Sequence, residues 1–344
     1  MKKSFIYPLF ATIILLSSCS TDLDVTGNYK ETMVVYGLLD QSQPKQYIKI
    51  NKAFLIEGNA LQYAQEKNAT QYENSLNVVL KRINIDGTEL SSYNLIADNT
   101  IPKNSGIFYG PDQSNVIYSV ATTLYSDSEY KLVIRNNETG AEVSSQTMLL
   151  NDATLTSPNP LSPSSTFKII DPNNDNYNFA VRWNTGKNAR VYNAIIRFNY
   201  IDSTLTGNIS QTLDWVFPTK KTQYLTGGEA MSSDFLGQDL LQFIGNQLND
   251  YPGLIARKPG KVSIVLIAGG DDLKTFIEVN APSTGLIQEK PEFTNIKNGL
   301  GLFSARYFKP PFGKTMDGNS LDELACGQYT KDLKFLDRNG VICP

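Results

Sequence analysis

The sequence predicts a mainly β protein with two antiparallel β-sandwiches and one or two short helices. Short runs rich in β-branched and aromatic side chains recur along most of the chain, as in proteins with many short strands. Only 19% of the residues are charged, whereas 18 Tyr and 16 Phe supply large surfaces for packing. At 344 residues the chain is long for one domain, and a proline-rich stretch at residues 156–163 divides it.

The first sandwich is expected over residues 29–150. Residues 32–39 are a continuous apolar run that suits a buried strand, and residues 47–54 alternate isoleucine with lysine and asparagine, which gives one wet face. Residues 58–73 break this pattern and predict a short helix or a loop excursion. Gly140 lies in a turn where a positive φ is needed. Further strands are expected at residues 76–83, 89–95, 116–121, 129–136 and 141–150.

A linker is expected over residues 151–165. Pro158, Pro160 and Pro163 fall within six residues of one another there. Because proline has no N–H to donate and has a fixed φ, this stretch does not suit a sheet interior. It predicts a stiff, extended connector.

The second sandwich is expected over residues 166–306. Phe179, Val181 and Trp183 share one face of a strand, and after a turn Tyr192 begins a long strand with a regular apolar face. This arrangement resembles the fibronectin type III pattern, in which a core Trp packs under a neighbouring Tyr. The resemblance implies an immunoglobulin-like or fibronectin type III-like sandwich. Later strands are expected at residues 209–217, 262–268 and 276–281.

One helix is expected near residues 233–248. Its apolar positions share a single stripe at helical spacing, and Ser232, Ser233 or Asp234 can cap it. Such a helix would cover an open end of the second sandwich, and a helix that binds a partner is the alternative. The apolar positions are Leu236, Leu240, Phe243, Ile244 and Leu248.

The C-terminal tail is expected over residues 307–344. It contains Cys326 and Cys343. Thiols of exported proteins tend to oxidise, so a disulfide between these two cysteines is the natural pairing. Two unpaired thiols are the alternative.

The start of the chain predicts export and lipidation. A basic start precedes an apolar run at residues 5–16, which has the pattern of a secretory signal peptide and is too short to cross a bilayer. Residues 16–19, LSSC, resemble the bacterial lipobox, whose cysteine receives diacylglycerol. We therefore expect residues 1–18 to be removed and Cys19 to anchor the chain in the outer-membrane lipid bilayer. A free cysteine after an ordinary signal peptide is the alternative.

Residues 19–28 are expected to be an acidic, flexible tether. The two residues after Cys19 lack the acidic side chain that retains lipoproteins in the inner membrane of well-studied Gram-negative bacteria. Residues 20–24, STDLD, resemble the acidic signal that sends Bacteroidota lipoproteins to the outer face of the outer membrane. Asp22 and Asp24 would be its charges. The alternative is a solvated tether whose aspartates have no particular role.

Composition excludes several classes of function. The formal net charge is −3, and removal of Lys2 and Lys3 with the signal peptide would make it −5. Without a basic block, the chain suits neither nucleic acid nor electrostatic binding to anionic lipid. The chain has no histidine, which excludes Ser-His-Asp and Cys-His catalysis and histidine-ligated zinc. We expect no enzymatic activity, no cofactor and no metal site.

Three short motifs could carry chemistry, and each has a structural alternative. Residues 171–176 have the acidic spacing of a calcium loop but lack its glycine and its bidentate glutamate, so a polar turn is preferred. Asp271 and Asp272 could serve as acid and base in glycoside hydrolysis, yet adjacent residues at a strand end point apart. Residues 202–204, DST, resemble a short O-glycosylation motif of these bacteria.

Three segments together resemble a large family of Bacteroidota lipoproteins of unknown function. They are residues 16–19, residues 130–147 and the sequence TNIKNGLGLFSA at 294–305. The family has a two-part β architecture, and its genes often lie beside those of TonB-dependent receptors. The resemblance implies a TonB-dependent β-barrel receptor as a partner. Gly299 and Gly301 are expected to allow close backbone approach, and the apolar residues around them to fill a core.

These features predict a lipid-anchored outer-membrane protein, exposed at the cell surface, that helps a TonB-dependent transporter capture a glycan or peptide nutrient. Tyr109 in one loop, and Tyr307, Phe308 and Phe312 in a proline-stiffened loop at residues 307–312, are the expected stacking platforms. Packing of these rings against the core is the alternative. A structural or adhesive surface protein is the second functional hypothesis, and a hydrolase of an extracellular polymer is the third.

Overall fold

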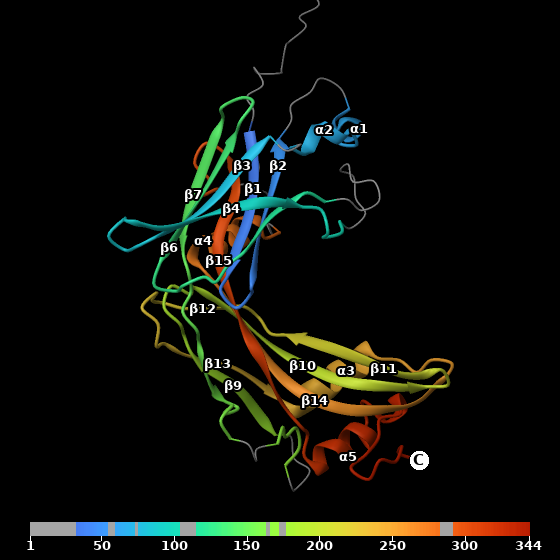
Figure 1. Ribbon diagram of the computed structural model, residues 1–344. Coiled ribbons are helices and arrows are strands. Elements are labelled where there is room, and N and C mark those ends of the chain that lie inside the picture. The colour runs from blue at the N-terminus through green and yellow to red at the C-terminus, as the bar shows by residue number, and fades with distance from the viewer. Residues whose placement is uncertain are drawn as a thin grey trace, which may run out of the picture.

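The protein is mainly β, as predicted. The computed structural model describes residues 32–53, 59–72, 75–103, 115–162, 166–171, 177–282 and 292–344. These residues form one sheet of 12 strands and one of three, together with short helices. Figure 1 shows the strands in two groups that share the long strand β15 (Leu300–Lys314). Apolar side chains from both groups belong to one continuous buried cluster.

The first group contains β1 to β7, with all of its internal pairs antiparallel. Neighbouring strands follow the order β1-β2-β5-β4-β3-β6-β7. The helical turns α1 and α2 fall in the excursion predicted after the second strand, and Gly140 has the expected positive φ of 74°. The bounds are β1 Thr32–Asp40, β2 Lys45–Ala53, α1 Ala60–Tyr63, α2 Lys67–Thr70, β3 Leu76–Ile83, β4 Glu89–Asp98, β5 Ile117–Ala121, β6 Glu129–Asn136 and β7 Glu142–Met148.

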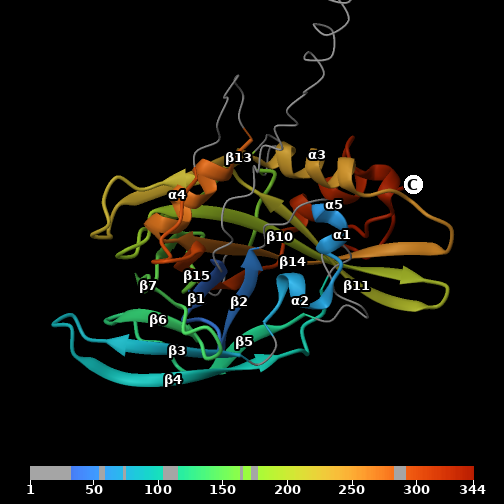
Figure 2. The same cartoon turned by 90° about the horizontal axis from the view of Figure 1, so that it is seen from above.

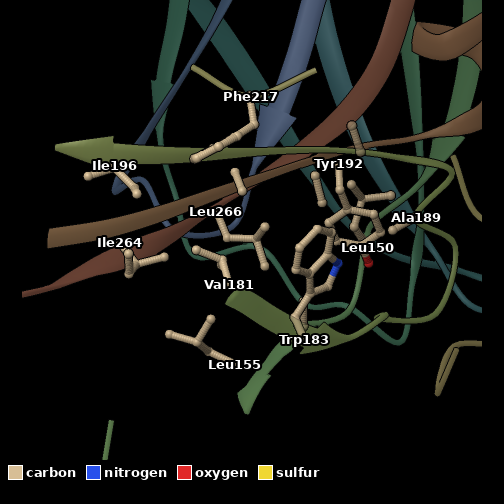
Figure 3. Close-up of a cluster of buried hydrophobic side chains, with 14 of the residues drawn as sticks. Leu150, Leu155, Val181, Trp183, Ala189, Tyr192, Ile196, Phe217, Ile264 and Leu266 are labelled. Carbon is tan, nitrogen blue, oxygen red and sulfur yellow. The ribbon is translucent and has the colours of Figure 1, made fainter. Parts of the chain in front are cut away.

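The second group contains β8 to β14. Its three-stranded sheet, in the order β13-β9-β8, packs against β10 and β14 of the large sheet (Figure 3). β8 lies within the predicted linker and pairs with β9. The bounds are β8 Thr154–Ser157, β9 Asn178–Asn184, β10 Val191–Thr204, β11 Gly207–Val216, β12 Lys220–Lys221, β13 Ala230–Leu236 and β14 Leu254–Gly269.

The predicted contact between Trp183 and Tyr192 is confirmed. Both side chains are fully buried, and their ring centroids lie 5.8 Å apart between the two facing sheets (Figure 3). The Tyr192 hydroxyl accepts a hydrogen bond of 2.8 Å from the backbone N–H of Gly186, in the turn between β9 and β10. The aromatic pair therefore joins the two sheets and also fixes the turn that connects them.

β15 links the two groups. Its first half pairs parallel with β1, with Gly301 opposite Val35, and its second half pairs antiparallel with β14. The boundary predicted at residue 306 consequently falls inside this strand. Gly301 has a φ of 109°, and a Cβ at that position would lie 2.0 Å from the carbonyl oxygen of Val35. The expected close backbone approach is confirmed.

The predicted helix begins later than expected. Residues 230–236 pair with β9 as β13, so α3 runs from Gly237 to Gln247. The Asp239 carboxylate, in the first turn, accepts a hydrogen bond from the N–H of Leu236, the N-cap residue of the helix. The serines and Asp234 predicted to cap the helix pair with β9 instead.

Of the predicted apolar stripe, Leu240 and Ile244 are buried and Phe243 and Leu248 are partly buried, but Leu236 is 43% exposed. Leu241, which the stripe did not include, is also buried. Figure 2 shows α3 on the opposite side of the molecule from β3 and β4.

The strand predicted at residues 276–281 is wrong. This segment belongs to helix α4 (Asp271–Asn280), none of whose side chains is buried. Asp271 and Asp272 lie in its first turn, where negative charges interact favourably with the helix dipole. The β-branched residues of this segment suggested a strand. Their preference is outweighed because acidic residues favour a helix start here and the segment lies on the surface, where no sheet neighbour pairs with it in the described structure.

The C-terminal segment packs on the second group. It contains α5 (Gly318–Cys326) and a short 3-10 turn at Lys331–Leu333. Cys326 and Cys343 form a disulfide with their Cα atoms 5.3 Å apart. Phe335 is fully buried, with its ring 5.7 Å from that of Phe198. Within the described ranges, no helix is both long and apolar enough to cross a membrane.

Candidate ligand-binding groove

Several predicted site residues lie outside the described part of the chain. Cys19, Asp22, Asp24 and Tyr109 are among them. The acidic calcium-like motif is also outside it, except for Asp171. No cluster of three or more potential metal-ligating side chains occurs in the ranges that the structure describes.

The proline-stiffened loop predicted at residues 307–312 is instead part of β15. Tyr307 and Phe312 are half-buried and pack against the core, and Phe308 pairs in register with Ile267 of β14. Burial, together with the nearby Asp152 carboxylate, raises the pKa of Tyr307 to about 12. The two prolines that suggested a loop are exposed at a shift in register between the strands, where a missing N–H is tolerated.

The adjacent carboxylates Asp271 and Asp272 have separate structural partners. Asp271 forms an ion pair of 2.9 Å with Arg190, and Asp272 accepts a hydrogen bond of 2.9 Å from the side-chain amide of Asn295. Asn295 also bonds the backbone N–H and carbonyl of Phe303, so Asp272 helps to fix the start of β15. These contacts give both carboxylates a role in holding α4 in place.

On the outer face of β1 and β2, three hollows formed by described residues meet around Tyr36. Their volumes are about 410, 340 and 280 Å³, and Tyr36 lines all three. Its side chain is 43% exposed, although it lies on a strand with paired neighbours on both sides. We call this surface the Tyr36 groove. The residues of its first hollow used below are Tyr36, Lys49, Asn51, Lys52, Gln71, Lys103 and Asn115.

Strand alternation places the groove side chains together. In the antiparallel register of β1 and β2, Tyr36 lies opposite Lys49. Cross-strand partners of this kind project from the same face of a sheet, side by side. The intervening residues Val35 and Ile50 point inward and are buried. The solvent-facing side predicted for the strand at residues 47–54 is thereby confirmed, and it forms part of the floor of the groove.

Two lysines on this face of β2 have different electrostatic surroundings. Lys45 forms an ion pair of 2.5 Å with Asp98, and the hydrogen bond between them raises the pKa of Lys45. The Lys49 ammonium instead donates to the side-chain oxygen of Asn115 at 2.6 Å and to the carbonyl of Val116 at 2.9 Å. Burial and the positive charge of Lys103 lower the pKa of Lys49 to about 8.

An aromatic wall continues the groove toward α4. The ring of Tyr36 meets that of Phe276 edge to face, with centroids 6.0 Å apart. Both rings line the third hollow, next to the NGLG segment. A ring that is half-exposed and braced by a second ring offers a flat apolar surface at little cost in side-chain entropy.

The groove combines the features of a binding site. An exposed aromatic ring, amide side chains and a half-buried ammonium group converge in one concave surface. The polar alternation in β2 is visible in the sequence, but the alternation alone indicates no function. The missed signal is a lysine between two core isoleucines, directly across from an exposed tyrosine on the paired strand.

Comparison with known proteins assigns no family. No protein-family model and no curated protein matches this chain. Among solved structures, the C-terminal globular domain of an oligosaccharyltransferase from Pyrococcus abyssi is similar at 12% identity. The match covers 62% of this chain and 41% of that one, with a TM-score of 0.16. A likeness this weak carries no argument about fold or function.

Proposed function

We propose that this chain is a lipid-anchored binding protein of the bacterial outer membrane. It faces the cell exterior, captures a glycan or peptide nutrient in the Tyr36 groove and acts with a TonB-dependent transporter. The lipobox-like residues 16–19 support the anchor, and the family resemblance supports the partner. The groove supports the capture role.

One observation carries the binding role, namely the set of hollows that meet at Tyr36. A large aromatic ring that stays 43% exposed on an interior strand has not been used for core packing. Concave surfaces that combine such a ring with a few polar groups are typical of small-ligand sites. The alternative platforms Tyr307, Phe308 and Phe312 on β15 are all less exposed than Tyr36, and Tyr307 and Phe312 also pack against the core.

Replacing Tyr36 with alanine should weaken ligand binding about tenfold, because the main apolar surface of the groove is lost. The measurement is titration calorimetry of the full lipidated chain in detergent against a panel of oligosaccharides and peptides. Tyr224→Ala is the matched control, since Tyr224 is 64% exposed and does not line the groove. Equal affinities of native protein and Tyr36→Ala for every ligand bound would contradict the proposal.

The predicted surface address has its own test. Replacing Asp22 and Asp24 together with alanine should leave Cys19 lipidated but reduce cleavage by a protease added to whole cells, because the acidic export signal is removed. The readout is the fraction of chain cleaved, with lipidation checked by mass spectrometry. Unchanged cleavage would show that these two charges do not direct the chain to the cell surface.

The transport role and the adhesive alternative differ in the partner that they require. A transport accessory should co-purify with a β-barrel protein from gently solubilised membranes. Recovery of a lone chain under those conditions would favour a structural or adhesive protein.

A further inference from the structure

We propose that the Tyr36 groove binds an acidic oligosaccharide, whose carboxylate or sulfate group is held by the ammonium of Lys49. This inference rests on the proposed binding function and names the chemical class of its ligand. Tyr36 supplies the surface for a sugar ring, and Asn51 and Gln71 supply amides beside it.

The first hollow concentrates positive charge in a protein whose net charge is negative. Three lysines, Lys49, Lys52 and Lys103, line it, and no acidic residue is among its described lining residues. The whole chain has a formal charge of −3. Positively charged side chains that line a concave surface attract ligands of the opposite sign.

Lys49 is the centre of this cluster. Its ammonium is partly withdrawn from water, and within the described residues its hydrogen bonds go to two neutral acceptors rather than to a carboxylate. Partial burial of a charge costs free energy unless an opposite charge offsets it. An anionic group of a ligand would supply that charge, and the nearby Lys103 would strengthen the attraction.

The sheet topology favours a sugar over an extended peptide. Peptides commonly bind sheets by adding a strand to a free edge. Here β1, which carries Tyr36, is paired on both sides, with β2 and with β15, whereas β5 pairs with β2 only along residues 45–48. Recognition by Tyr36 must therefore use side chains on the face of the sheet. Aromatic stacking, amide groups and an ammonium suit the ring, hydroxyls and acid group of an acidic sugar.

The test is calorimetry of the full lipidated chain with four probes: trigalacturonate, a sulfated chondroitin hexasaccharide, neutral maltohexaose and hexaglutamate. We expect one or both acidic sugars to bind best, and the preference between them identifies carboxylate or sulfate. Lys49→Met should weaken that binding about ten- to hundredfold, as expected for loss of a hydrogen bond to a charged group. Lys81→Met is the matched control, because Lys81 lies on β3 in an exposed pair with Glu89.

Affinity for the acidic sugar should also fall about tenfold between pH 7 and pH 9. The pKa of Lys49 lies near 8, so its ammonium is charged below this pH and loses its proton above it. Lys49→Arg keeps the charge and should flatten the profile, which a merely structural role would not do. The other charged or titratable groups of the two hollows that Lys49 lines are Tyr36, Asp40, Lys45, Tyr47, Lys52, Lys103 and Arg306.

The possible outcomes distinguish the preference for an acidic sugar from the more general proposal that the groove binds a ligand. Tyr36-dependent binding of maltohexaose that is as tight as that of the acidic sugars, and unchanged in Lys49→Met, would overturn the inference and leave the binding function standing. A preference for hexaglutamate would replace the sugar with an acidic peptide and also overturn it. If the native chain binds neither these probes nor any ligand of the wider panel, both the inference and the binding function are overturned.

Discussion

Replacing Arg257 with alanine should lower the free energy of unfolding by about 3–5 kcal/mol. Arg257 and Asp202 form an ion pair of 3.0 Å whose side chains are only 2% and 4% exposed. Arg257 also donates to the carbonyl of Leu333 at 2.8 Å and to that of Asn249 at 2.7 Å. Truncation would therefore leave a buried carboxylate without its cation and two carbonyls without this donor.

Chemical denaturation measures this effect, and the chain contains a matched control. Arg197 forms a two-bond pair with Asp214, at 2.8 Å for each bond, but the two side chains are 32% and 35% exposed. Arg197→Ala should cost only about 0.2–1 kcal/mol, because water screens an exposed pair. The double variant Arg257→Met, Asp202→Leu should recover much of the lost stability, because it removes both charges and leaves no unpaired charge in the core. If Arg257→Ala and Arg197→Ala lower the free energy of unfolding by similar amounts, burial of the Arg257–Asp202 pair does not make it more important than an exposed pair.

Replacing Gly301 with alanine should destabilise the protein by about 4 kcal/mol. A left-handed φ costs an L-residue about 1–2 kcal/mol, and forcing an extra carbon into a packed contact typically costs about 1–3 kcal/mol more. Gly301 has a φ of 109°, and its added Cβ would lie 2.0 Å from the oxygen of Val35. Because that oxygen belongs to the backbone of β1, the parallel pair of β1 and β15 would have to separate.

Gly140→Ala separates the cost of the positive φ from the cost of the steric contact. Gly140 also has a positive φ, of 74°, but no heavy atom of the described residues lies within 4 Å of an added Cβ. This control should show the cost of the backbone conformation alone, about 1–2 kcal/mol. The difference between the two variants in denaturation then reports the close approach of β15 to β1. Equal losses would mean that this approach contributes nothing to stability.

Local patterns in the sequence predicted the strands of the first group well. The alternation of β2 follows directly from which of its faces is buried. The continuous apolar run of β1 predicted a buried strand, but only alternate side chains are fully buried and Tyr36 is 43% exposed. The Trp183–Tyr192 contact could also be predicted, because both residues lie on the inner faces of strands joined by a short turn. Gly301 was recognisable as a site of close approach, although its partner was not.

The features that could not be predicted depend on pairing between segments that are distant in the sequence. Nothing in the sequence of β15 identifies β1 as its parallel neighbour, and Leu300 pairs with a residue as distant as Val34. The consecutive prolines of β15 predicted a loop because their tolerance at a shift in register depends on β14. The groove was missed for a similar reason. Tyr36 and Lys49 lie on neighbouring strands, but Lys103 follows two further strands, and only the folded chain brings it to the same hollow.

The most direct test of the account is to locate the ligand on the protein. The best-binding oligosaccharide of the panel, carrying a diazirine, would be photo-crosslinked to the full lipidated chain, and the labelled peptides identified by mass spectrometry. Labels are expected on β1 and β2, around Tyr36 and Lys49, and should be lost when excess unlabelled sugar competes. Competed labels confined to other surfaces, such as β11 or the aromatic residues of β15, would contradict this expectation.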